Sequence, residues 1–314
     1  MSFAPPGPLA LGGAPLGNLF DTVAEDTARA TVQAALDAGI RYFDTAPHYG
    51  NGLSERRMGD VLRGRDVVIS TKVGRLLHPD PDAPRAQHGY VGGLPFRQSF
   101  DYSAEGAKRS LEDSLQRMGL PRIDIAWIHD VDETAHGADW EDAFDAAMRG
   151  AARALADLRD RGVIRAWGLG VNRVAPCLRA LDHARPDLFL LAGRWTLLDR
   201  SARGLLDRCV TQGVGVVAAG AYNSGILATG PRPGATYDYA PACEAVLART
   251  ARIEMACARY DVPLRAAALQ FAMSHPAIRC VLVGARSPAE IADVHAMMGT
   301  PIPPALWATP EIAR

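Results

Sequence analysis

Lysine is almost missing from this chain of 314 residues. Of its 34 Lys and Arg side chains, only Lys72 and Lys108 are lysines. Asp44 ends the short apolar run 41–44, and Lys72 ends the next strand-like run, 67–72. A buried carboxylate needs a cationic partner, because burying an unpaired charge is costly. The scarcity of lysine therefore makes Lys72 the expected partner of Asp44.

Long apolar runs and a leader sequence are also missing. No uninterrupted apolar run approaches the ~18 residues that span a membrane. The first residues, 1–6, have neither the basic nor the apolar region of a signal peptide. The net charge is −1, so no basic surface for nucleic acid or an anionic membrane is expected. These absences predict a soluble, cytoplasmic protein, and a monomer or small homo-oligomer is expected.

The chain has few cysteines, and they form no metal-binding or redox motif. They are odd in number and widely spaced, and neither CxxC nor HExxH occurs. Reduced thiols and no metal site are therefore expected. The five cysteines are Cys177, Cys209, Cys243, Cys257 and Cys280.

What the sequence does contain is a repeated alternation of short apolar runs with segments of helical spacing. Eight such strand–helix units without a linker favour a closed (β/α)8 barrel over residues 1–314, a single α/β domain. The first expected strand starts at Leu9, and the others cover 41–44, 67–72, 123–129, 164–172, 188–192, 214–219 and 278–283. The expected helices cover 25–38, 53–63, 104–118, 140–161, 174–184, 201–212, 242–260, 264–274 and 288–298.

An open, doubly wound sheet is the alternative α/β fold. It usually has a GxGxxG turn after its first strand. Here the first strand is followed by 12–17, whose spacing and proline break that pattern, and Gly168 and Gly170 lack a third glycine. The barrel is therefore the preferred prediction.

Three connections are too long for ordinary turns: 74–102, 130–139 and 220–241. Loops of this length are usually functional or disordered, so we expect all three to shape a pocket, and 74–102 is expected to be irregular. His48 and His78 are expected on loop surfaces. The charged residues 55–57 are expected on a solvated helix face.

Four ionisable side chains stand at or just after the ends of consecutive predicted strands. They are Asp44, Tyr49, Lys72 and His129. In (β/α)8 barrels the reactive groups come from the C-terminal ends of several strands. We therefore expect the four side chains to meet at one end of the barrel.

Their chemistry indicates proton transfer to or from an oxygen atom. An ammonium beside a phenol lowers the phenol's pKa, so Lys72, held by Asp44, is expected to make Tyr49 a proton donor and acceptor near neutral pH. His129 would hydrogen-bond the same oxygen. Since no nucleophile–base pair is present, hydride transfer with a nicotinamide is the expected companion step.

The segments 43–46, 49–50, 70–72 and 128–129 resemble the signatures of the aldo-keto reductases, and the resemblance extends over essentially the whole chain. It implies a (β/α)8 barrel, NAD(P)-dependent reduction of carbonyls or oxidation of alcohols, and no metal. The catalytic residues that it implies are Asp44, Tyr49, Lys72 and His129.

Five further segments are similar to the bacterial sugar dehydrogenase branch of that family, which includes L-fucose and D-threo-aldose 1-dehydrogenases, and to pyridoxal 4-dehydrogenase. This resemblance implies oxidation of a sugar-like substrate at C1, or reduction of the corresponding carbonyl. Oxidation of pyridoxal to 4-pyridoxolactone is the alternative. The segments are 14–19, 168–172, 191–194, 222–228 and 284–288.

The resemblance also implies cofactor-binding residues. Asn172 matches the ligand of the nicotinamide carboxamide. Arg194 replaces a glutamine that contacts the cofactor amide in many relatives. The loop that contains Gly220, Asn223 and Gly225 matches the segment that covers the pyrophosphate.

The final strand–helix turn bears on the choice between NAD and NADP. Gly284 and Glu290 stand where many relatives have a lysine and an arginine for the 2′-phosphate, so NAD is favoured over NADP. Arg286 is the one basic side chain in this turn, and Ser287 begins a helix whose N-terminus suits an anion.

Trp195 and His88 are expected to line the substrate pocket. Two other functions are also compatible with the sequence. One is a Schiff-base lyase that uses Lys72, because barrels also carry reactive lysines at strand ends. The other is a non-catalytic subunit that senses NAD(P).

Overall fold

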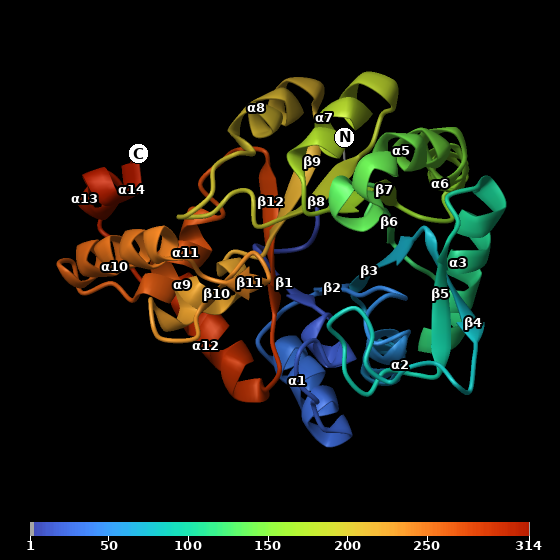
Figure 1. Ribbon diagram of the computed structural model, residues 1–314, viewed down its shortest axis with the longest axis horizontal. Helices are drawn as coiled ribbons and strands as arrows, with labels where there is room; N and C mark the ends of the chain where they lie inside the picture. The colour runs from blue at the N-terminus through green and yellow to red at the C-terminus, as the bar shows by residue number, and fades with distance from the viewer. Residues whose placement is uncertain (1–2, 314) are drawn as a thin grey trace.

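The backbone forms one closed barrel of eight parallel strands with helices around it (Figure 1). This computed structural model describes residues 3–313. The strands are β1 (Leu9–Gly12), β2 (Tyr42–Asp44), β3 (Val68–Val73), β6 (Ile125–His129), β7 (Ala166–Val171), β8 (Leu188–Ala192), β9 (Gly215–Ala219) and β12 (Ile278–Gly284). Their order around the ring is β1-β12-β9-β8-β7-β6-β3-β2.

All eight predicted strands are present, and the (β/α)8 fold is confirmed. The ring closes because β1 pairs in parallel with both β2 and β12, which leaves no open edge and excludes the doubly wound sheet. The reason that the strands were predictable is their burial. Nearly every strand residue faces either the barrel interior or the helices, so each strand is a continuous apolar run.

The helices that cover the barrel also lie close to their predicted bounds, with one correction. The predicted single helix 140–161 is broken at Gly150, whose backbone leaves the helical region. A Cβ atom on Gly150 would lie 2.4 Å from the carbonyl oxygen of Tyr102, so glycine allows this close approach of two backbones. The helices are α1 (Glu25–Asp37), α2 (Leu53–Leu62), α3 (Ala104–Met118), α5 (Trp140–Arg149), α6 (Ala151–Asp160), α7 (Val174–His183), α8 (Arg203–Gln212), α10 (Glu244–Ala258), α11 (Leu264–Phe271) and α12 (Pro288–Gly299).

The barrel interior is filled by side chains. Its largest member is Trp127 on β6, which is fully buried. Gly168 on the neighbouring strand β7 makes room for it, because a Cβ there would lie 3.3 Å from the indole and 1.7 Å from the carbonyl oxygen of Leu188. Any side chain at position 168 would collide with these two neighbours, so only glycine allows the strands and the indole to pack this closely.

The connection 74–102 is not irregular, which corrects the prediction, and the other long loop after β9 is also ordered. Residues 74–102 contain an antiparallel hairpin of β4 (Arg75–Pro79) and β5 (Phe96–Phe100), and 220–241 contain α9 (Ile226–Thr229) and a smaller hairpin of β10 (Thr236–Tyr237) and β11 (Ala240–Pro241). In the view of Figure 1 the two hairpins lie on opposite sides of the ring of strands. The short elements outside the ring are completed by η1 (Pro15–Gly17), α4 (Glu133–His136), η2 (Gly137–Asp139), η3 (Asn223–Gly225), α13 (Pro304–Trp307) and α14 (Pro310–Ala313).

The charged face of α2 is also not solvated as predicted. Glu55 is fully buried and accepts hydrogen bonds from Thr71 (2.7 Å) and Arg117 (2.5 Å). Arg57 is 4% exposed and donates to the backbone oxygens of Leu16 and Val23. These two side chains anchor neighbouring segments to α2. Of the three charged residues 55–57, Arg56 is the exposed one.

Candidate active site

The four predicted catalytic groups lie together at the mouth of the barrel, which is the end formed by the C-terminal ends of the strands. Asp44, Lys72 and His129 come from β2, β3 and β6, which are consecutive in the ring. Tyr49 follows β2 in a turn. The ammonium of Lys72 lies 4.5 Å from the centre of the Tyr49 ring, and the rings of Tyr49 and His129 are 6.1 Å apart. The four side chains therefore meet at one end of the barrel, as their positions at the strand ends predict.

Asp44 and Lys72 form a buried ion pair at the base of this group. Lys72 Nζ donates to Asp44 Oδ2 (2.6 Å) and to the backbone oxygen of Thr45 (2.9 Å). The other carboxylate oxygen, Asp44 Oδ1, accepts from Ser70 Oγ and Trp127 Nε1. Asp44 is 0% and Lys72 is 2% exposed. A pair so completely buried and hydrogen-bonded fixes the position of the ammonium.

The pKa of Tyr49 differs from the prediction. The ring keeps some exposure to solvent, but burial of the phenol raises its pKa well above the usual 10, and the carboxylates of Asp44 and Asp130 act in the same direction. The charge of Lys72 is matched by Asp44 at 2.6 Å, which is why the expected lowering is not found. Tyr49 is therefore a protonated phenol at neutral pH.

His129 is neutral in this environment. Burial lowers its pKa well below 6.5, and the nearby Asp130 carboxylate only partly opposes this effect. Asp130 Oδ1 lies 3.5 Å from His129 Nε2, and Asp130 Oδ2 pairs with Arg75 (2.9 Å). Burial works against the charge of Asp130, but the basic groups around it, first His129 and then Arg75, lower its pKa to about 2. Asp130 is thus a carboxylate beside a neutral imidazole.

Further aromatic side chains lie around these groups, and most of them were not predicted from the sequence. Tyr90 is buried and stacks on Tyr49 with ring centres 5.8 Å apart. His48 lies 5.7 Å from His129, and His88 lies 5.4 Å from His48. The structure therefore places the expected pocket residue His88 near the mouth. It also corrects the expectation that His48 is on the loop surface.

These extra residues have little signal in the sequence. His48 and Asp130 are direct chain neighbours of Tyr49 and His129, which is the one hint available. Arg75 and Tyr90 come from the connection that was expected to be irregular. Its folding as a hairpin is what brings Arg75 to Asp130.

Trp195 does not join this group. Its ring stacks on Phe271 (5.4 Å) and meets His275 edge-on (5.6 Å), so it packs in the interior against α11. This placement differs from the expectation that Trp195 lines the substrate pocket.

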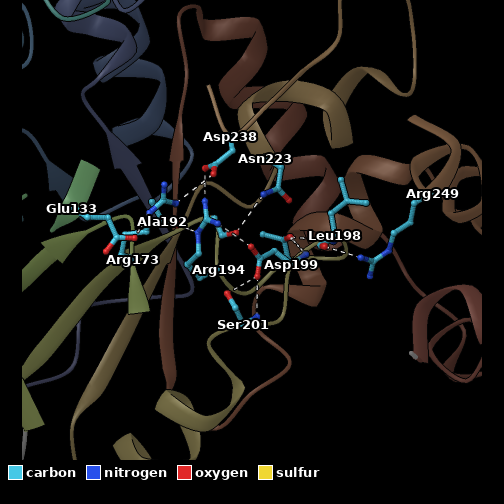
Figure 2. A network of polar contacts seen from close by, with 12 residues as sticks. Glu133, Arg173, Ala192, Arg194, Leu198, Asp199, Ser201, Asn223, Asp238 and Arg249 are labelled. Atoms are coloured by element: carbon cyan, nitrogen blue, oxygen red, sulfur yellow. Dashed lines mark hydrogen bonds and ion pairs between the residues drawn. The ribbon is translucent and has the colours of Figure 1, made fainter. Parts of the chain in front are cut away.

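The predicted cofactor residues Arg194 and Asn223 lie together on the β8–β9 side of the mouth, as Figure 2 shows. The guanidinium of Arg194 pairs with Asp199 (3.0 Å) and with Asp238 of the β10–β11 hairpin. Asp238 also contacts Arg173 (3.4 Å), which follows β7. The charge of Arg194 is thus matched by carboxylates, and Asp238 ties the long loop after β9 to the ends of β7 and β8.

The same loop has features that fit a dinucleotide. Gly220 has φ +65°, and a Cβ there would lie 3.0 Å from the nitrogen of Gly193. Within residues 3–313 the Oδ1 atom of Asn223 is buried without a hydrogen-bond partner, while its Nδ2 donates to Gly193 (3.4 Å). Gly225, with φ +108°, precedes α9. An unpaired buried acceptor beside a glycine turn suits a hydroxyl of a bound nucleotide.

The N-terminus of α12 is the second segment for which the sequence predicts a cofactor contact. Ser287 caps the helix by accepting from the backbone nitrogen of Glu290 (3.3 Å), and Glu290 accepts from the nitrogen of Arg286 (2.8 Å). Gly284 ends β12 directly before this turn. Asn172, at the end of β7, is half-buried, and its backbone is held by Asp132. The roles of all these residues toward a cofactor stay predictions.

Within residues 3–313, no three His, Cys, Asp or Glu side chains are gathered closely enough to hold a metal ion. None of the helices in that range has the length and apolar character needed to cross a bilayer. The five cysteines are free thiols.

Comparison with known sequences identifies relatives over the full chain. The sequence model of the Aldo/keto reductase family matches residues 8–311. Pyridoxal 4-dehydrogenase from Microbacterium luteolum is 44% identical, covering 96% of this chain and 92% of that protein. D-threo-aldose 1-dehydrogenase from a Pseudomonas species is 38% identical, covering 98% and 93%.

Solved structures show the same architecture. The holo form of an aldo-keto reductase from Bacillus halodurans superposes with a TM-score of 0.75 at 26% identity, covering 97% of this chain and 90% of that one. Glycerol dehydrogenase from Gluconobacter oxydans, at 23% identity, has a TM-score of 0.74 with 96% and 89% covered, and supports the fold alone.

Proposed function

Since the chain belongs to the aldo/keto reductase family, whose members use a nicotinamide cofactor, we propose that it oxidises the hemiacetal carbon of a cyclic, hydroxylated substrate to a lactone. A sugar oxidised at C1 is the first candidate. The observation that carries the proposal is the meeting of Tyr49, Lys72, Asp44 and His129 at one mouth. The similarity to D-threo-aldose 1-dehydrogenase supports the sugar.

Each of the four side chains has a distinct part in this chemistry. Tyr49 takes the hydroxyl proton during oxidation, or gives it back during reduction. The neutral His129 donates a hydrogen bond to the same oxygen. Lys72, held by Asp44, stabilises negative charge on the phenol oxygen after the proton has left. The bound nicotinamide supplies the acceptor for the hydride.

NAD is the proposed cofactor rather than NADP. Glu290 lies in the first turn of α12, and its carboxylate also pairs with the Arg286 side chain (3.4 Å). A carboxylate at this position repels a 2′-phosphate and accepts hydrogen bonds from a ribose hydroxyl. Because Glu290 pairs with Arg286, the one basic side chain in the turn, Arg286 is less able to bind a phosphate.

Pyridoxal is the second candidate substrate, because pyridoxal 4-dehydrogenase is 44% identical over nearly the whole chain. The test is a panel of aldoses and pyridoxal with NAD and with NADP, followed by the absorbance of the reduced cofactor. Turnover of an aldose with NAD is the expected result. If pyridoxal is oxidised and no aldose is, the second candidate substrate is the right one. Cofactor binding without turnover of any substrate indicates a sensing subunit.

A Schiff-base lyase does not suit the environment of Lys72. An amine must be neutral and accessible to attack a carbonyl. Lys72 is 2% exposed and donates hydrogen bonds to Asp44 and Thr45, which hold it as an ammonium. Trapping of substrate on Lys72 with borohydride would contradict this view.

The two directions of the reaction are expected to depend differently on pH. Because the pKa of Tyr49 is raised, the phenol is protonated at neutral pH and is ready to donate in reduction. Oxidation needs the deprotonated fraction, so its kcat is expected to rise by up to about tenfold per pH unit above neutrality, while reduction stays level. The lowered pKa of His129 predicts no inflection near its ordinary value of 6.5. Profiles of kcat against pH in both directions test this, and a reduction rate that falls between pH ~6 and ~8 would contradict it.

A further inference from the structure

His48 lies beside the catalytic group, in the loop that follows β2. It directly precedes Tyr49 and is half-buried. Its ring meets His129 and Tyr90 edge-on, at 5.7 Å and 5.2 Å between ring centres. The proposed mechanism gives His48 no part, although it is as close to His129 as Tyr49 is. Its hydrogen bonds show what it offers to a substrate.

The hydrogen bonds beside His48 begin at a fixed amide. Asn51 is 3% exposed, and its Nδ2 donates to the backbone oxygens of Leu94 (3.2 Å) and Phe96 (2.8 Å). Since both partners are acceptors, this end of the amide is the nitrogen. The other end, Oδ1, therefore accepts from Gln98 Nε2 at 2.6 Å.

The orientation of Gln98 follows from that contact. With its nitrogen turned toward Asn51, its Oε1 atom faces Arg75 Nη1 (3.2 Å) and His48 Nδ1 (2.8 Å). Arginine has only donors, so the amide oxygen is consistent with both neighbours. An amide oxygen has no proton to give, and the hydrogen bond with His48 requires the proton on Nδ1.

His48 has only one ring proton at neutral pH. Burial, followed by the positive charge of Arg75, lowers its pKa to about 4, and Asp130 and Gln98 oppose this only in part. The proton is on Nδ1, so Nε2 keeps a free lone pair. His129 has the opposite arrangement: the Asp130 carboxylate, 3.5 Å from its Nε2, is near enough to favour a proton there but too far to accept a full hydrogen bond from it, so this N–H can still donate to a substrate. The mouth thus presents one imidazole donor and one imidazole acceptor.

We propose that His48 is a specificity-determining residue, whose Nε2 atom accepts a hydrogen bond from a substrate hydroxyl close to the reacting carbon. This inference rests on the proposed function and narrows its substrate class. In this arrangement Tyr49 and His129 donate hydrogen bonds to the reacting oxygen, and His48 accepts one from a neighbouring hydroxyl. A sugar with a free hydroxyl at C2 can bind both the donors and the acceptor, whereas a 2-deoxy sugar can bind only the donors.

The test compares an aldose with its 2-deoxy analogue in three proteins. In the parent protein, kcat/KM for the deoxy sugar is expected to be about tenfold lower, since water replaces the missing hydroxyl at a half-buried site. His48→Phe keeps a ring but removes the acceptor, so the ratio of the two kcat/KM values should fall close to one. His78→Phe, on the exposed part of β4, is the matched control and should keep the parent ratio.

An unchanged ratio in His48→Phe overturns the role of His48 while the proposed function stands. Absence of cofactor-dependent turnover on every aldose and on pyridoxal overturns the proposed function, and this inference with it. The tautomer is checked separately by nitrogen NMR of histidine-labelled protein. A proton on Nδ1 of His48 is expected, and a proton on Nε2 would contradict the inference.

Discussion

Replacing Tyr49 with phenylalanine is expected to lower kcat by about 10²- to 10⁴-fold, the range typical of a lost general acid–base group. The change removes one oxygen atom and keeps the ring that stacks on Tyr90 and lies against Lys72. Cofactor affinity is therefore expected to stay the same. Steady-state kinetics, together with a cofactor titration by fluorescence, measure the two effects separately.

Tyr90→Phe is the matched control for this variant. Tyr90 is 6% exposed and its ring stacks on the ring of Tyr49. The control therefore loses a phenol oxygen close to the one that Tyr49→Phe removes. It is expected to keep kcat within about tenfold of the parent. Equal losses in the two variants, or parent-like turnover by Tyr49→Phe, would remove Tyr49 from its assigned role.

Replacing Lys72 with methionine is expected to destabilise the fold by about 3–5 kcal/mol, because it leaves the Asp44 carboxylate buried without its cation. Turnover should be lost as well, since the phenol oxygen loses its neighbouring charge. Urea unfolding measures the first effect, and kcat measures the second.

The double variant Lys72→Met with Asp44→Asn separates the two effects. With both charges removed, the free energy of unfolding is expected to recover most of the loss, because an apolar or neutral pair is often as stable as a buried ion pair. Turnover should stay low. A double variant as unstable as the single one would show that the stability comes from another contact of Lys72.

Much of the fold and the core of the site could be predicted from the sequence. A barrel strand buried on both faces is a continuous apolar run, so its end is visible, and Asp44, Lys72 and His129 stand at such ends. The scarcity of lysine identified the ion pair, and its N–O distance is 2.6 Å. These features depend on local sequence and on the strand order that the barrel imposes.

What could not be predicted depends on contacts between distant segments. The direction of the Tyr49 pKa shift was wrong, because burial and two carboxylates outweigh an ammonium that is already paired. The break at Gly150 depends on the close approach of Tyr102. His48 looked like a surface residue, because the hairpin that brings Gln98 and Arg75 toward it has no regular apolar pattern.

The central claim is that a hydride leaves the substrate's hemiacetal carbon for a nicotinamide while Tyr49 takes the proton. Its most direct test uses an aldose that contains deuterium at C1, with NAD and the intact enzyme, followed by mass spectrometry of the cofactor. The account predicts that the deuterium is found on the reduced nicotinamide, at a rate that Tyr49→Phe lowers by about 10²- to 10⁴-fold. Deuterium released to water, or retained in the product, would contradict it.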